Sequence, residues 1–214
     1  MHILFDLDGT LSNPKVGIIN SIKFALENLQ VEAPDNLDWC IGPPLLNSFK
    51  IILNTKSDSR AKNALELYRQ YFTKKGLYQN ILYPNIPELL KKLVDLEITL
   101  YVATSKPTIY AKRIISHFNL EHYFKFIYGS ELNGERSDKK ELISYILDKE
   151  KLHNKKTMMI GDRKYDLTGA HANNIPSVGV TYGYGSYDEL NHCQPAYLVN
   201  SPLDILDCID TFVL

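Results

Sequence analysis

From residue 84 onward the chain alternates short apolar segments with segments of helical periodicity, and this alternation limits the possible folds more than any other feature. The apolar segments are typical of buried strands and lie at 98–103, 126–128, 157–160, 177–181 and 197–199. Helical spacing of apolar residues predicts helices at 87–96, 107–118, 138–149, 165–172 and 202–212. Strands that alternate with helices form a parallel sheet covered by helices on both faces, so the sequence predicts an α/β fold.

A different pattern separates this region from the N-terminus. Residues 3–5 predict one short buried strand, whereas residues 13–83 contain helical patterns only, at 15–29, 45–53 and 61–75. We therefore predict a Rossmann-like core formed by residues 1–12 and 84–214. A small all-helical domain, residues 13–83, is inserted after the first strand.

The first strand leads directly into Asp6-Leu7-Asp8-Gly9-Thr10. Side chains two residues apart on a strand point the same way, so Asp6 and Asp8 can converge at its end. Two buried carboxylates repel each other unless a cation lies between them or one stays protonated. Gly9 allows an immediate turn, and Thr10 adds a hydroxyl. The motif therefore predicts a nucleophile, an acid/base and a metal site.

Two further candidates follow predicted strands or begin predicted helices. Thr104 and Ser105 end the strand at 98–103, where a hydroxyl can donate to a phosphoryl oxygen; Ser105 is also a plausible N-cap of the next helix. Lys139 or Lys140 opens the helix near Asp138, where a cation is unfavourable for the helix dipole unless it neutralises nearby anions. The simpler interpretations are a helix cap and a solvated lysine.

The last candidate is Gly161-Asp162-Arg163-Lys164-Tyr165-Asp166, which follows the strand at 157–160. Asp162 and Asp166 are four residues apart and can share a face. Asp162 alone is compatible with a helix cap, but together with Asp6 and Asp8 it provides a third carboxylate for Mg²⁺, which prefers oxygen ligands. The segment 182–185 predicts a flexible loop beside the site, followed by no clear helix.

The composition of the chain restricts the kinds of partner that it is expected to bind. The chain has 214 residues, 44% of them hydrophobic and 23% charged, with a formal net charge of −1, which is typical of a globular enzyme and indicates neither a nucleic-acid nor a membrane surface. Cys40, Cys193 and Cys208 form no CxxC pair, and there is no long apolar run or signal-like N-terminus. We expect a cytoplasmic protein, and its state as monomer or dimer stays open.

These sites, in this order, resemble those of the haloacid dehalogenase superfamily in its phosphatase branch. The pattern comprises Asp6-x-Asp8-Gly9-Thr10, Thr104, Lys139 and Gly161-Asp162-x-x-x-Asp166. The inserted helical segment resembles the small helical cap of this family, and residues 179–185 resemble its phosphoglycolate phosphatase-like group. The family often has proline after the third-motif lysine, whereas here Lys140 follows Lys139, so Lys140 stays an alternative.

The resemblance implies a mechanism through an aspartyl-phosphate. Asp6 would be the nucleophile, and Asp8 would protonate the leaving alcohol and then activate water. Thr104 and Lys139 would hold the transferring phosphoryl group, with Gly9 and Ser105 also at the phosphate. The metal, Mg²⁺ or alternatively Mn²⁺, would be bound by Asp6, Asp8 (through its backbone carbonyl) and Asp162, with Asp166 in support.

The expected function is hydrolysis of small phosphate monoesters, phosphoglycolate-like, so the partner would be a small phosphorylated metabolite. The acid at Asp8 favours O–P bond chemistry with an alcohol leaving group. The alternatives are a 5′-nucleotidase acting on nucleoside monophosphates and a sugar-phosphate mutase or other phosphotransferase. A non-catalytic ligand-binding protein with the same fold is the third possibility.

Overall fold

The computed structural model describes the backbone of residues 1–213 and the side chains of residues 1–209. It divides into two compact units, Met1–Asn13 with Leu82–Leu214 and Pro14–Ile81. The larger unit contains a six-stranded sheet whose strands lie in the order β5 (Phe124–Ser130), β4 (Thr99–Pro107), β1 (His2–Phe5), β6 (Thr157–Gly161), β7 (Ser177–Val180) and β8 (Tyr197–Val199).

Each pairing between neighbouring strands of this sheet is parallel, which confirms the predicted α/β fold. β1 lies in the interior of the sheet, with Phe5 in register with Val102 of β4 and with Ile160 of β6. Because the strands are parallel, the residues that follow them emerge at one edge of the sheet. This register determines which side chains can meet there.

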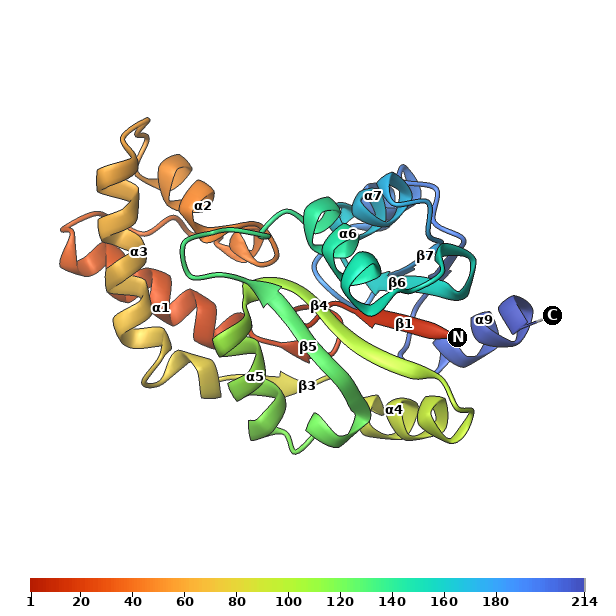
Figure 1. Cartoon of the computed structure of the whole chain (residues 1–214). Coiled ribbons are helices and arrows are strands. Elements are labelled where there is room, and N and C mark those ends of the chain that lie inside the picture. Colours follow the sequence, from red (N-terminus) through yellow and green to blue (C-terminus); the bar gives the residue numbers. More distant parts are fainter. Residues whose placement is uncertain (214) are drawn as a thin grey trace. The chain divides into compact units, whose positions relative to one another are not determined.

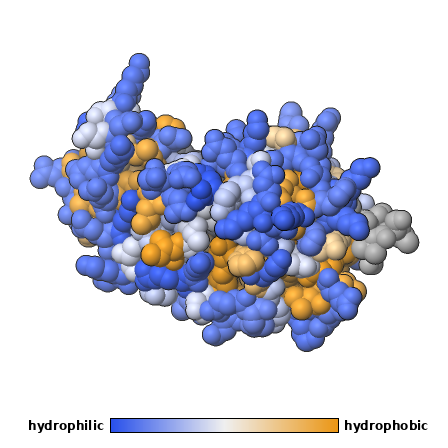
Figure 2. All heavy atoms as spheres, viewed as in Figure 1, coloured by the Kyte–Doolittle hydropathy of each residue, from blue (hydrophilic) through white to orange (hydrophobic). Residues whose placement is uncertain are grey.

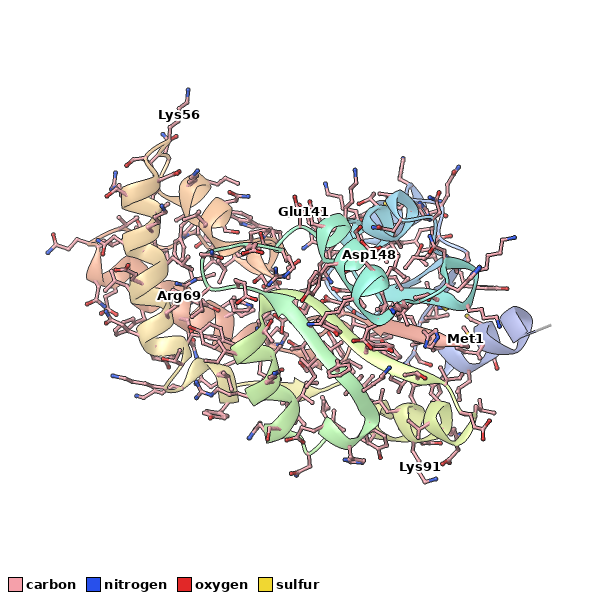
Figure 3. The ribbon with its side chains drawn as sticks, in the orientation of Figure 1. Met1, Lys56, Arg69, Lys91, Glu141 and Asp148 are labelled. Carbon is pink, nitrogen blue, oxygen red and sulfur yellow. The ribbon has the colours of Figure 1, made fainter. Side chains whose placement is uncertain are left out.

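Helices connect the strands and cover the sheet: α4 (Ile86–Asp95), α5 (Thr108–His117), α6 (Lys139–Glu150), α7 (Lys164–Ala172), α8 (Tyr187–Asn191) and α9 (Asp204–Val213). Figure 1 shows α6 and α7 on one face of the sheet and α4 on the other. Leu4 and Met159 of the sheet belong to the same buried apolar cluster as Ile143 of α6 and Ala170 of α7. The exposed residues of α6 include Glu141 and Asp148, which are labelled in Figure 3.

The smaller unit consists mainly of α1 (Lys15–Asn28), α2 (Leu45–Ile52) and α3 (Asp58–Phe72). Its core includes stacked Tyr68 and Phe72, with ring centroids 5.2 Å apart. Short 3₁₀ helices occur in both units, at η1 (Asp38–Cys40), η2 (Gly76–Tyr78), η3 (Glu121–Tyr123) and η4 (Asn154–Lys156). A separate two-stranded sheet pairs β2 (Ser12–Asn13) with β3 (Ile81–Leu82).

Three local predictions need correction. β4 continues to Pro107 because its end pairs with Ser130 of β5, so Ser105 lies in the strand and is not the N-cap of α5. The predicted strand at 126–128 is too short. β5 is an edge strand, and its exposed residues interrupt the apolar pattern from which the prediction was made. A short helix, α8, does follow the loop at 182–185, since the Ser186 side chain caps it by accepting from the Glu189 amide.

The surface has the hydropathy expected of a globular protein. Hydrophilic residues predominate on the face drawn in Figure 2, with apolar residues scattered among them. Within residues 1–213, no helix combines the length and the apolar character needed to cross a membrane.

Candidate active site

The candidate site lies at the carboxyl edge of the sheet, where β1, β4 and β6 end. Asp6 follows β1 directly, and its amide donates to the Ile160 carbonyl of β6 over 2.9 Å. Asp162 follows β6, and Thr104 lies within the extended β4. Parallel register therefore brings together the side chains that the sequence places at three separate strand ends.

The acidic side chains predicted at this edge are all buried: Asp6, Asp8, Asp162 and Asp166. Three of them, Asp6, Asp162 and Asp166, each offer a carboxylate oxygen, and these oxygens lie within 4.8 Å of one another. The Asp8 carboxylate is not part of this group, and the use of its backbone carbonyl as a metal ligand stays a prediction. Oxygen donors at this spacing suit a hard divalent cation.

Lys139 joins two of these carboxylates. Its Nζ lies 2.7 Å from Asp6 Oδ1 and 2.5 Å from Asp166 Oδ1, and it also donates to the Ala103 carbonyl over 2.8 Å. The contact with Asp166 is a buried ion pair, because both side chains are less than 5% exposed. Burial alone would lower the pKa of Lys139, but the pairs with Asp166 and Asp6 raise it, so the lysine stays charged.

The start of α6 determines which of the two candidate lysines lies at the acidic cluster. Asp138 is the N-cap, and its carboxylate accepts from the amides of Lys140 and Glu141 over 2.8 and 3.2 Å. This cap starts the helix at Lys139, whose side chain is buried, whereas Lys140 is exposed. The structure therefore brings Lys139, and not Lys140, to the acidic cluster.

The two aspartates that follow β6 have different hydrogen-bond partners. Asp166 caps α7, because its Oδ2 accepts from the Arg163 amide over 3.1 Å. Asp162 is not a helix cap: its Oδ2 accepts from the Tyr184 amide over 2.8 Å, and its Oδ1 faces the Thr10 hydroxyl at 3.4 Å. The capping interpretation of Asp162 is therefore wrong, and its carboxylate is held by two distant segments.

Two glycines allow this close approach to Asp162. Gly9 has a φ of +90°, and a Cβ there would lie 2.1 Å from Asp162 Oδ2. A Cβ on Gly183 would lie 2.3 Å from Asp162 Cβ and 2.5 Å from the Gly9 carbonyl oxygen. Any side chain at either position would displace the carboxylate or the loops around it. The loop at 182–185 thus encloses Asp162, a role that its sequence did not reveal.

The charges in this cluster do not balance. Burial raises the pKa of Asp162 well above its usual value, and repulsion from Asp6 and Asp166 raises it further. Burial also raises the pKa of Asp166 to about 6, although Lys139 opposes the shift. When ionised, the four aspartates at this edge exceed the charge of the two buried lysines there, Lys139 and Lys106, by two. A divalent cation would balance this excess, so the residues present fit Mg²⁺ or Mn²⁺.

The predicted phosphate-binding hydroxyls differ in their surroundings. Thr104 is 2% exposed, and its Oγ1 accepts from the Lys106 amide over 3.3 Å. Ser105 is half-buried, and its carbonyl accepts from the Ser130 hydroxyl over 2.9 Å. Both therefore belong to a stretch of β4 that is anchored beside the acidic cluster.

Sequence reasoning missed Lys106. Its Nζ lies 2.6 Å from Asp8 Oδ2, and the two side chains are only 6% and 11% exposed. Burial raises the pKa of Asp8, and the ion pair with Lys106 opposes that shift. The only signal was its position directly after Thr104 and Ser105, since a lysine at the end of a strand is usually solvated.

Comparison with known proteins assigns the class. Residues 3–180 match the model of the haloacid dehalogenase-like hydrolases, and the chain belongs to this family, which confirms the resemblance read from its motifs. A 5′-nucleotidase from Pseudomonas aeruginosa is 48% identical over 198 residues, which cover 92% of this chain and 89% of that protein.

Two other relatives extend the comparison. A phosphoglycolate phosphatase from Vibrio parahaemolyticus is 25% identical over 97% of this chain and 95% of its own length. The crystal structure of a "predicted phosphatase" from Clostridium acetobutylicum superposes with a TM-score of 0.93 at 42% identity, covering 97% of each chain. The likeness thus spans nearly the whole chain, including both units.

Proposed function

We propose that this protein is a Mg²⁺-dependent phosphatase that hydrolyses small phosphate monoesters through an aspartyl-phosphate on Asp6. The observation that carries the proposal is the cluster of Asp6, Asp162 and Asp166 within 4.8 Å, with Lys139 joining Asp6 to Asp166. Phosphoryl transfer depends mainly on positioning and on neutralising charge, and this cluster supplies both.

In the first step, an Asp6 carboxylate oxygen attacks phosphorus while the bond between phosphorus and the ester oxygen breaks. Asp8 gives its proton to that oxygen, so that the product leaves as an alcohol and Asp8 becomes a carboxylate. Thr104 donates a hydrogen bond to the phosphoryl group, with Gly9 and Ser105 beside it. Lys139 offsets the charge that develops on its oxygens.

In the second step, Asp8 accepts a proton from water as the water oxygen attacks the aspartyl-phosphate. The bond between phosphorus and Asp6 breaks, which restores the Asp6 carboxylate and releases inorganic phosphate. Mg²⁺, held by Asp6, Asp162 and the Asp8 backbone carbonyl with support from Asp166, would stabilise negative charge on the transferring group. Mn²⁺ suits the same oxygen donors.

For the substrate, we favour a nucleoside 5′-monophosphate over phosphoglycolate. The relative that is 48% identical over 92% of this chain is named as a 5′-nucleotidase, whereas the phosphoglycolate phosphatase is 25% identical. We further propose that the helical segment 13–83 serves as the small cap, which its insertion after β1 supports. The free thiols of Cys40, Cys193 and Cys208 support a reducing, cytoplasmic location.

The test is phosphate release from nucleoside monophosphates, phosphoglycolate, sugar phosphates and p-nitrophenyl phosphate, in Mg²⁺, Mn²⁺ or a chelator. We expect metal-dependent release that is fastest with a nucleoside monophosphate and is abolished by Asp6→Asn in a folded protein. More than a few per cent of residual activity in Asp6→Asn would contradict the nucleophile assignment. Transfer of phosphate to a sugar hydroxyl instead of water would favour the mutase alternative, and binding without turnover the ligand-binding one.

A further inference from the structure

At the candidate active site β4 extends beyond β1 and β6, the two strands that follow it across the sheet. It has 9 residues, whereas β1 has 4 and β6 has 5. Its extension is anchored to β5, because Pro107 is in register with Ser130 and the Ser130 hydroxyl donates to the Ser105 carbonyl over 2.9 Å. Lys106 lies between these two anchor points, in a stretch where the register of β4 against β5 shifts.

The Lys106 side chain is buried against one acidic partner of the site. It is 6% exposed, and its Nζ lies 2.6 Å from Asp8 Oδ2. A buried ammonium group costs several kcal/mol of solvation free energy unless partners compensate, and the ion pair with Asp8 contributes to that compensation. Lys139 pairs with Asp6 and Asp166, so the two buried lysines serve different carboxylates.

The two oxygens of Asp8 differ in their contacts. Oδ2 is paired with Lys106, whereas Oδ1 is buried and has no hydrogen-bond partner in the described chain. A carboxyl group held by one oxygen has a defined orientation, which leaves its second oxygen to exchange a proton. Such pre-organisation is what separates a catalytic acid from a carboxyl that merely lies nearby.

We propose that Lys106 is the positioning residue for Asp8: it holds Oδ2 so that Oδ1 is the oxygen that gives a proton to the leaving group and later takes one from water. This inference rests on the proposed phosphatase function. Lys106 does not touch the reacting atoms, and its charge stabilises the Asp8 carboxylate that remains when the alcohol leaves.

The leaving group provides the first test. For each variant we would compare kcat/KM for an alkyl phosphate monoester, whose alcohol needs protonation, with that for p-nitrophenyl phosphate, whose leaving group does not. Lys106→Met should lower kcat/KM for the alkyl ester by about tenfold or more, a part of the roughly 10²–10⁴-fold worth of the acid, and lower the p-nitrophenyl value much less. Lys106→Arg should restore most of the loss.

A matched control is Lys125→Met, which removes another lysine paired with a carboxylate, 3.1 Å from Glu150. It should leave the ratio between the two esters unchanged. An equal loss for both esters in Lys106→Met would overturn the positioning role and indicate a structural one. A loss confined to KM would also overturn it, because Lys106 would then bind substrate.

A second test uses the Asp8→Asn background. If Lys106 acts through Asp8, Lys106→Met should cost little more once Asp8 is replaced, so the two losses should not add. Full additivity would overturn the proposal. The cycle is measured with the alkyl ester, because that is the substrate for which each single variant is expected to show a loss.

A measurement without turnover separates this inference from the proposed function. In ¹⁵N-labelled protein, a buried and paired Lys106 ammonium group should give a slowly exchanging resonance that Lys106→Met removes and Asp8→Asn shifts. The absence of this resonance would overturn the positioning role, even in an active enzyme. The resonance in a protein that hydrolyses no ester would overturn the phosphatase function, and with it the catalytic meaning of the pair.

Discussion

Gly183→Ala tests whether the loop at 182–185 holds the Asp162 carboxylate. The backbone of Gly183 is not in the left-handed region, so alanine at this position acts only through the steric clash of its Cβ. Its Cβ would lie 2.3 Å from Asp162 Cβ, whereas ordinary contact begins at 3.4 Å. The loop or the aspartate must therefore move by about 1.1 Å, and the 2.8 Å hydrogen bond from the Tyr184 amide would lengthen or break.

The expected losses of stability and of rate follow from that movement. Overpacking of a buried site costs about 1–3 kcal/mol of unfolding free energy, which a domain with roughly 5–15 kcal/mol can lose and still fold. A displacement of about 1 Å at a catalytic group can cost about 10²-fold in rate. We therefore expect a folded protein with weakened metal binding and about 10²-fold lower kcat/KM.

The assay combines a calorimetric titration with Mn²⁺, thermal unfolding and phosphate release. Gly179→Ala on β7 is the control, because its Cβ would meet the flexible end of the Leu198 side chain on β8 at 2.7 Å, away from the carboxylates. It should leave metal affinity within about twofold of the parent. Parental metal affinity and turnover in Gly183→Ala would refute the view that this loop positions Asp162.

Three further predictions concern the same site. Lys139→Met should lower kcat/KM by at least about 10²-fold, whereas the exposed Lys140→Met should change it by no more than about twofold; equal effects would contradict the assignment of Lys139. Burial raises the pKa of Asp166 from 3.8 to about 6. The stability that protonated Asp166 contributes to the metal-free protein is therefore lost as the pH rises through about 6. Above that pH, Mg²⁺ competes with fewer protons for this carboxylate. Mg²⁺ should therefore raise the Tm more at about pH 7 than at about pH 5, and Asp166→Asn should reduce this difference. Asp138→Ala removes the cap of α6 and should lower the unfolding free energy by about 1 kcal/mol in a denaturant titration; no change would contradict the capping role.

The fold was largely predictable because buried strands and amphipathic helices leave periodic patterns. The parallel sheet followed from the alternation of β4, α5, β5, α6, β6, α7 and β7, because each of these strands contains a short apolar run. The ends of these elements were less predictable, because pairing determines them. β4 continues through Ser105 to Pro107 only because β5 offers a partner at Ser130.

Part of the candidate site was predictable for a related reason. Residues that directly follow parallel strands must meet at one edge, so Asp6, Asp162 and Thr104 could be expected together from their positions alone. The choice between Lys139 and Lys140 could not, because it depends on where α6 begins. The Asp138 cap determines that start, and it directs one lysine inward and leaves the other exposed.

What the sequence determined by itself is the class of chemistry: carboxylates at strand ends, a hydroxyl and a lysine in a parallel α/β protein. Only the tertiary structure decided which group each carboxylate contacts. Lys106 pairs with Asp8, and the loop of Gly183 and Tyr184 encloses Asp162, through contacts between segments far apart in the chain. Local patterns record which residues are buried, but the partner of a buried charge depends on the packing of the whole core.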